Sequence, residues 1–180
     1  HYIEDAAAII EHSIGDTPYS IIGHSMGGLI ALLGTMRGAL KPQSLILSSP
    51  FLRLPNRKLP GTLVRRMLPM LNNSRLAGRP AMRYAKQEMT TENNPYTHCP
   101  ERLQRIKGTP YPVPPPCFRW VFHCSQAITE AFSEERLKAH HCPTLLLTGE
   151  AESIVNPSGF GYWVRKAARI SPAPLSWHVI

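Results

Sequence analysis

The sequence predicts an α/β protein with a mostly parallel sheet and crossover helices. Helical patterns and short apolar strand patterns alternate over residues 1–49, as they do in βαβ units. The same alternation returns over residues 143–180 after a long interruption. The chain has 180 residues, of which 43% are hydrophobic, and this is enough for one ordinary core.

The first elements follow from local spacing. Residues 3–14 repeat apolar side chains at helical intervals and stop at Gly15, which predicts an amphipathic helix. Residues 19–22 form a short, β-branched run typical of a buried strand. Residues 29–40 then predict a buried helix, and residues 44–49 predict a second buried strand.

The alternation stops at Pro50, and residues 52–139 read as an insertion on the sheet. Residues 62–71 could form a basic amphipathic helix, which Pro69 would kink or end near its last turn. A helical pattern also surrounds residues 120–132. We therefore expect residues 1–51 and 140–180 to form the core domain.

The remaining core elements lie in the second of these segments. Residues 143–149 predict a third buried strand, residues 160–170 a helix, and residues 175–180 a last strand.

The charge is unevenly distributed. The net charge is +8, and no acidic residue occurs between Asp16 and Glu88. Such a basic segment attracts phosphate on nucleic acid or on lipid head groups, although few aromatic residues interleave with it, which disfavours nucleic acid. The basic segment consists of Arg53, Arg57, Lys58, Arg65, Arg66, Arg75, Arg79, Arg83 and Lys86.

Other classes are disfavoured by composition. No apolar run reaches the roughly 20 residues of a membrane-spanning helix, and no signal peptide is evident. The four cysteines include no C-x-x-C pair, so we expect free thiols in a reducing, cytoplasmic compartment. Three His–Cys neighbours, at 98–99, 123–124 and 141–142, lack the spacing of zinc ligands.

The strongest motif is Gly23-x-Ser25-x-Gly27, directly between a predicted strand and a predicted helix. This is the context of a nucleophile elbow, in which the serine stands at the positive end of a helix. We expect so tight a turn to require both glycines, Gly23 and Gly27. A glycine-rich turn that only binds phosphate is the alternative.

A serine nucleophile needs a histidine base and an acid, which follow the elbow in the chain. Both aspartates precede Ser25, so the acid must be a glutamate. Glu150 and Glu152 come just after the third predicted strand, although either could be a solvated loop carboxylate. His24 adjoins Ser25 and is interpreted as structural.

Two motifs carry a family resemblance. Gly-His-Ser-Met-Gly-Gly at 23–28 and Leu-Leu-Leu-Thr-Gly-Glu-Ala-Glu-Ser-Ile-Val at 145–155 resemble the α/β-hydrolase superfamily. The likeness is to its monoacylglycerol lipase and lysophospholipase branch, which is serine aminopeptidase-like. Residues 94–98 and 117–121 resemble cap segments of bacterial lysophospholipases.

The resemblance implies an α/β-hydrolase fold that carries residues 52–139 as a cap and is incomplete at both ends, as an internal fragment. It places the acid three residues after Gly149, at Glu152, where the family most often has aspartate; Glu150 is second choice. His178 falls in the last predicted strand, whereas the family's histidine lies beyond that strand. His178 is therefore a weak candidate for the base.

The resemblance also implies the activity, a serine hydrolase that cleaves a lysophospholipid or a monoacylglycerol. Ser25 would attack the acyl carbonyl, the Met26 N–H would donate to the oxyanion, and Glu152 would orient a histidine outside these residues. No cofactor and no metal are implied. The 180 residues alone are expected to be inactive.

Two alternatives stay open. One is a soluble carboxylesterase or a proline-type aminopeptidase on the same fold. The other is a non-catalytic, basic module that binds phosphate or nucleic acid. For the hydrolase we expect a lipid ester substrate, no nucleic acid, and peripheral contact with the anionic inner membrane through Arg53, Arg57, Lys58, Arg65 and Arg66.

Overall fold

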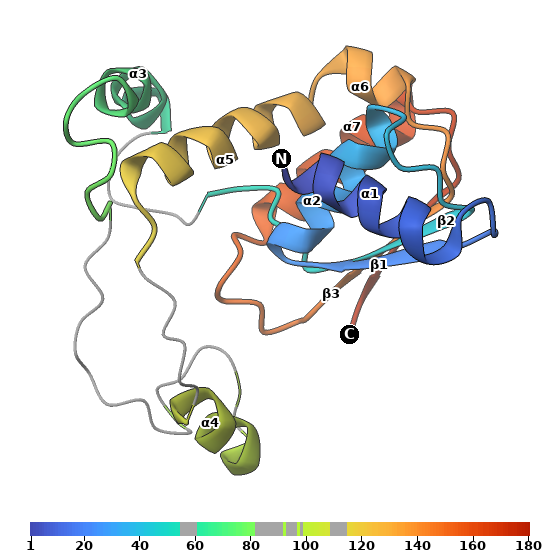
Figure 1. Cartoon of the computed structure of the whole chain (residues 1–180), viewed down its shortest axis with the longest axis horizontal. Coiled ribbons are helices and arrows are strands. Elements are labelled where there is room, and N and C mark those ends of the chain that lie inside the picture. The colour runs from blue at the N-terminus through green and yellow to red at the C-terminus, as the bar shows by residue number, and fades with distance from the viewer. Residues whose placement is uncertain (55–60, 82–91, 93–96, 98, 109–114) are drawn as a thin grey trace. The chain divides into compact units, whose positions relative to one another are not determined.

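A computed structural model describes residues 1–54, 61–81, 92, 97, 99–108 and 115–180 of the chain (Figure 1). The helices and strands follow the order α1 (Tyr2–Ile14), β1 (Ser20–His24), α2 (Met26–Met36), β2 (Ser44–Ser48), α3 (Gly61–Asn72), α4 (Pro100–Lys107), α5 (Phe118–Ala131), α6 (Glu134–Lys138), β3 (Thr144–Thr148), α7 (Ser158–Ile170) and β4 (Leu175–Val179).

The four strands form one parallel sheet in the order β1-β2-β3-β4. The predicted α/β class is thereby confirmed. One register row runs across the whole sheet, from Gly23 through Leu47 and Leu146 to Trp177. Because all strands point the same way, their carboxyl ends meet at a single edge, where α/β proteins place functional side chains.

The two faces of this sheet differ in burial. α2 packs on β1 and β2, α7 packs on β4, and Figure 1 shows α1, α2 and α7 on the same side of the strands. On that side Leu45, Leu47 and Leu146 are at most 1% exposed, and they form the core with α2 and α7. On the opposite face Ile22 is 74% exposed.

The chain divides into two compact units. The first comprises His1–Asn56 and Ser125–Ile180, and the second comprises Arg57–Cys124. The expected insertion at 52–139 is wider than this second unit. The first unit includes residues 52–56 at one end of the expected insertion and residues 125–139 at the other. The second, longer difference arises because α6 packs on α2 and α7, and Trp163 Nε1 donates to the carbonyl of Ala131 at 3.0 Å.

Within the second unit, two chain segments are joined by backbone hydrogen bonds. Residues 77–81 bind residues 116–119 through the N–H groups of Ala81, Phe118 and Arg119, at 2.8 to 3.1 Å. α3 contains Pro69 and continues past it to Asn72, so this proline does not end the helix.

Helix α4 was not predicted from the sequence. The sequence signal for the start of this helix is Pro100, because proline is favoured at the first helical position. Leu103 is the buried residue of α4.

None of the helices that the structure describes is both long enough and apolar enough to cross a bilayer.

Candidate active site

Ser25 occupies the tight turn between β1 and α2. Its backbone has φ 51° and ψ −120°, a left-handed conformation that L-residues rarely adopt and that costs about 1–3 kcal/mol. Hydrogen bonds hold it there. The Ser25 N–H donates to Ser48 O at 3.0 Å, and Ser25 O accepts from the N–H groups of Gly28 at 3.1 Å and Phe51 at 2.9 Å. The end of β2 therefore supports the strained turn.

In the elbow, close packing requires glycine at positions 23 and 28. A Cβ at Gly23 would lie 2.8 Å from Gly28 Cα, and a Cβ at Gly28 would lie 3.0 Å from Pro50 Cβ. A Cβ at Gly27 would meet nothing within 4 Å. The expectation that the tightness of the turn requires Gly27 was therefore wrong, because a Cβ at Gly27 would point into open space, although the Gly27 carbonyl oxygen lies 2.9 Å from the Cβ position of Gly23.

The serine hydroxyl stands at the start of α2 without capping it. Ser25 is the N-cap residue of α2, yet its side chain makes no cap hydrogen bond, and the residue is half-buried. Met26 is the first helical residue, so its N–H has no acceptor within the helix. This N–H and the helix dipole can both stabilise an oxyanion that forms beside Ser25.

Glu152 lies in the loop that follows β3, and its carboxylate is held by backbone N–H groups. Oε1 accepts from Ile154 at 2.8 Å and from Val155 at 3.0 Å, and Val155 is buried. Glu150 differs, because its side chain is exposed and its N–H donates to Ile180 O at 2.8 Å. The geometry favours Glu152 over Glu150 as the oriented carboxylate.

Opposing effects act on the Glu152 carboxyl, and its pKa is lowered. Partial burial raises the pKa, whereas hydrogen bonds from the Ser49 hydroxyl and from the N–H groups of Val155 and Ile154, with the charge of His24, lower it. Glu152 is therefore an anion at neutral pH, as an acid that supports an imidazolium must be.

Ser49 is a site residue that the sequence reasoning missed. It follows β2, is 7% exposed and has a positive φ of 40°. Its N–H donates to Leu147 O at 2.8 Å, while its hydroxyl acts on Glu152. The carbonyl of the adjacent Ser48 accepts from the Ser25 N–H. Ser48 and Ser49 therefore connect the turn at Ser25 to the loop that carries Glu152. The sequence signal that could have identified Ser49 is its position, since it is a polar residue directly after a buried strand.

His178 is an exposed residue of β4, as expected of an ordinary strand histidine. Its register row runs through Leu147 and Ser48 to His24, the residue before Ser25. Three strand spacings, about 14 Å, thus separate β4 from β1. The structure does not bring His178 to Ser25. His24 itself binds Ser48 Oγ through Nδ1 at 3.2 Å.

The predicted membrane-contact residues are described only in part. Arg53 is exposed and donates to Ser158 Oγ at 2.5 Å, and Arg66 is exposed in α3. Arg57, Lys58 and the side chain of Arg65 lie outside the described residues. Within the described ranges, no group of three metal-binding side chains is present.

The sequence profile of the family described as serine aminopeptidase, S33 matches residues 1–172. The chain belongs to this family. Its parallel sheet and its strand–Ser25–helix turn are those of an α/β hydrolase, so the resemblance noted in the sequence is confirmed. No curated protein sequence matches the chain.

Solved structures share this fold. The monoacylglycerol lipase of Paleococcus ferrophilus is 19% identical with a TM-score of 0.67, and the match covers 98% of this chain and 65% of that one. A thermostable carboxyl esterase of Bacillus coagulans is 17% identical with a TM-score of 0.73, over 98% and 61%. A soluble variant of the Saccharomyces cerevisiae monoglyceride lipase is 19% identical with a TM-score of 0.64, over 99% and 57%. The S33 family chain thus spans 57–65% of these three structures.

Proposed function

We propose that the protein is a serine hydrolase that cleaves the carboxylic ester of a lipid, most specifically a lysophospholipid or a monoacylglycerol. The observation that carries this proposal is the strained conformation of Ser25 at the start of α2, together with a carboxylate held at the same edge of the sheet. Strain of this kind is kept where the surrounding structure enforces it, as at active sites.

In the proposed reaction, Ser25 Oγ attacks the acyl carbonyl as a histidine removes its proton. The Met26 N–H donates to the oxyanion of the tetrahedral intermediate. The histidine then protonates the departing alcohol, which leaves an acyl-serine. Water, deprotonated by the same histidine, attacks the acyl-serine, releases the fatty acid and restores Ser25.

Glu152 orients that histidine and stabilises its positive charge. His178 is unsuited to the role, because β4 lies about three strand spacings from β1. We propose that the base comes from sequence outside these 180 residues. Support for a lipid substrate comes from the lipase and lysophospholipase motifs of the sequence and from the lipases among the structures of the same fold.

The test uses the full-length protein. A fluorophosphonate should label the wild type and fail to label Ser25→Ala, because only an activated serine reacts. Ser20→Ala is the matched control, since it removes an exposed hydroxyl from the other end of β1. Labelling that survives Ser25→Ala would remove the nucleophile assignment.

A series of esters with increasing acyl length separates the lipid substrate from the alternative, a soluble carboxylesterase. For a lipid enzyme, kcat/KM should rise with chain length, because each buried methylene contributes about 0.8 kcal/mol. A preference for acetate or butyrate esters would favour the carboxylesterase. Cleavage of prolyl amides in place of esters would favour the aminopeptidase.

A further inference from the structure

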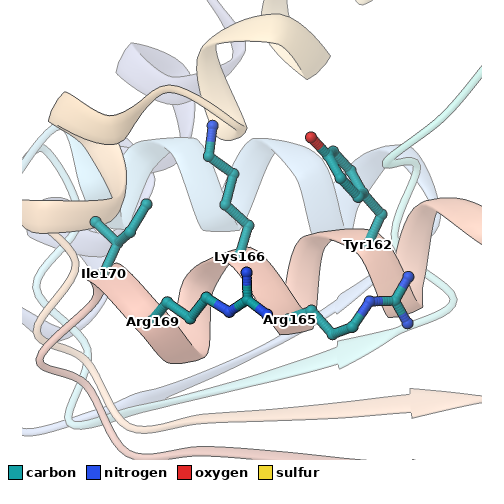
Figure 2. A pocket seen from close by; sticks show the side chains of 5 residues that line it. All are labelled: Tyr162, Arg165, Lys166, Arg169 and Ile170. Carbon is teal, nitrogen blue, oxygen red and sulfur yellow. The ribbon is translucent and has the colours of Figure 1, made fainter.

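The outer side of α7 forms a concave, basic surface away from the elbow. It is lined by Tyr162, Arg165, Lys166, Arg169 and Ile170, has a volume of about 340 Å³ and is open to solvent (Figure 2). We call it the α7 basic pocket. Figure 2 shows Tyr162 and Lys166 pointing from α7 toward the end of α5, with Arg165 and Arg169 along the outer side of the helix. The helical intervals of three and four residues place these side chains on one stripe.

The positive charge of this pocket is not compensated. α7 contains no acidic residue, and none of the ion pairs among the described residues includes Arg165, Lys166 or Arg169. Glu130 precedes Phe132, the contact residue of Lys166, but it is already bound by Arg37 and Arg136.

The interaction with the helix dipole does not account for both arginines of the pocket. Arg169 lies in the last turn of α7, where a cation favours the helix dipole, but Arg165 lies before that turn. Arg165 and Arg169 are four residues apart, where like charges repel on a helix. An anion between them would relieve that repulsion.

Two side chains of the pocket, Lys166 and Tyr162, are held in place by neighbours. Lys166 Nζ donates to Phe132 O at 2.8 Å, and the Tyr162 ring stacks on Phe132 with centroids 5.5 Å apart. Arg165 lies against Gly161, where an added Cβ would be 3.1 Å from Arg165 Nη1 and 3.4 Å from Trp177. Donors that are held before a ligand arrives lose less entropy on binding.

We propose that the α7 basic pocket binds a phosphate group, either free or carried by a lipid head group. Guanidinium groups donate pairs of parallel hydrogen bonds to phosphate oxygens, and an ammonium adds a further point charge. The site uses neither Ser25 nor Glu152, and none of its lining residues belongs to the basic segment at 53–86. It does not depend on the proposed hydrolase activity.

The decisive variant is the double substitution Arg165→Gln, Arg169→Gln. Its matched control is Arg102→Gln, Arg105→Gln, which removes the same charge from exposed positions of α4, the second of them also in a last turn. Isothermal titration with inorganic phosphate, at ionic strength fixed with chloride, gives the dissociation constant. We expect the α7 variant to weaken binding by at least about tenfold, because charge-assisted hydrogen bonds are lost. The α4 control and Ser25→Ala should keep the wild-type constant.

Co-sedimentation with vesicles distinguishes the two sources of phosphate. Binding of free phosphate that needs Arg165 and Arg169 identifies a soluble ligand. Binding only to phosphatidylglycerol vesicles, and not to phosphatidylcholine vesicles, with loss in the α7 variant alone, identifies a lipid head group. If neither probe binds, or if the α7 and α4 variants lose binding equally, the proposal is overturned. Arg165→Lys, Arg169→Lys keeps the charge and should bind with intermediate strength, which guards against a folding defect in the glutamine variant.

Discussion

Glu152 differs from its neighbour Glu150 by two backbone hydrogen bonds from Ile154 and Val155 that fix its carboxylate. In the full-length protein we expect Glu152→Gln to lower kcat by roughly three to four powers of ten, because a histidine without its acid loses its tautomer and its charge support. Glu150→Gln should leave kcat unchanged, since Glu150 is exposed. Steady-state kinetics with one ester decides between them, and a damaging Glu150→Gln would mean that the wrong carboxylate was chosen.

His140 is a fully buried imidazole in the connection between α6 and β3. Thr144 Oγ1 donates to Cys142 O at 2.9 Å and must therefore accept from His140 Nε2, 2.8 Å away. His140 Nδ1 has no hydrogen-bond partner in the part of the chain that the structure describes. Burial, with a smaller effect of His141, lowers the pKa of His140 from 6.5 to about 4.

This lowered pKa predicts a loss of stability in acid. The unfolded chain binds a proton near pH 6.5, while the folded chain resists it until about pH 4. The full contribution is therefore present above pH 6.5 and is lost as the pH falls to 4, by about 3 kcal/mol at 1.36 kcal/mol per pKa unit. Urea unfolding at several pH values measures the slope. His140→Gln should flatten it and the exposed His12→Gln should not; equal slopes in all three proteins would refute the prediction.

At the scale of the elements, the elbow depends on how closely β1 and α2 approach. We expect Gly23→Ala to lower the free energy of unfolding by about 1–3 kcal/mol, because its Cβ would overlap the Gly28 backbone at 2.8 Å. Gly27→Ala is the matched control. It should change the free energy of unfolding by less than about 1 kcal/mol, since alanine fits the open space and favours a helix. Equal losses in both variants would contradict this account of the turn.

At the scale of the whole molecule, the described helices of the first unit leave one face of the sheet open. Ile22 is 74% exposed there, in the register row of Ile46 and Leu145, which are half-buried. We expect the 180-residue chain to bind anilinonaphthalene sulfonate and to self-associate as its concentration rises.

Ile22→Thr should reduce both effects, because threonine keeps the strand propensity of isoleucine and removes part of the apolar row. Ile9→Thr on α1 is the control, since Ile9 is 65% exposed and lies outside the sheet. Dye fluorescence and light scattering are the measurements. No difference between the two variants would show that the open face is not the source of association.

The sequence by itself predicted the core elements, the tight turn at Ser25 and the loop that carries Glu150 and Glu152. Each of these predictions depends on neighbours in the chain: apolar spacing predicted β1, α2 and β3, and the order of residues made a glutamate the expected acid. Helix α4 was missed because only Leu103 in it is buried, so its apolar spacing is weak.

Only the tertiary structure decided which residues meet. The Ser49 hydroxyl, just after β2, binds the carboxylate of Glu152 in the loop after β3. β4, which carries His178, lies three strand positions from β1. Close packing in the turn requires glycine at position 28 and not at position 27. These facts depend on strand order and on contacts across about a hundred residues of chain. The spacing of side chains along one element carries no information about them, because it reports how a residue faces the core and not which distant residue it faces.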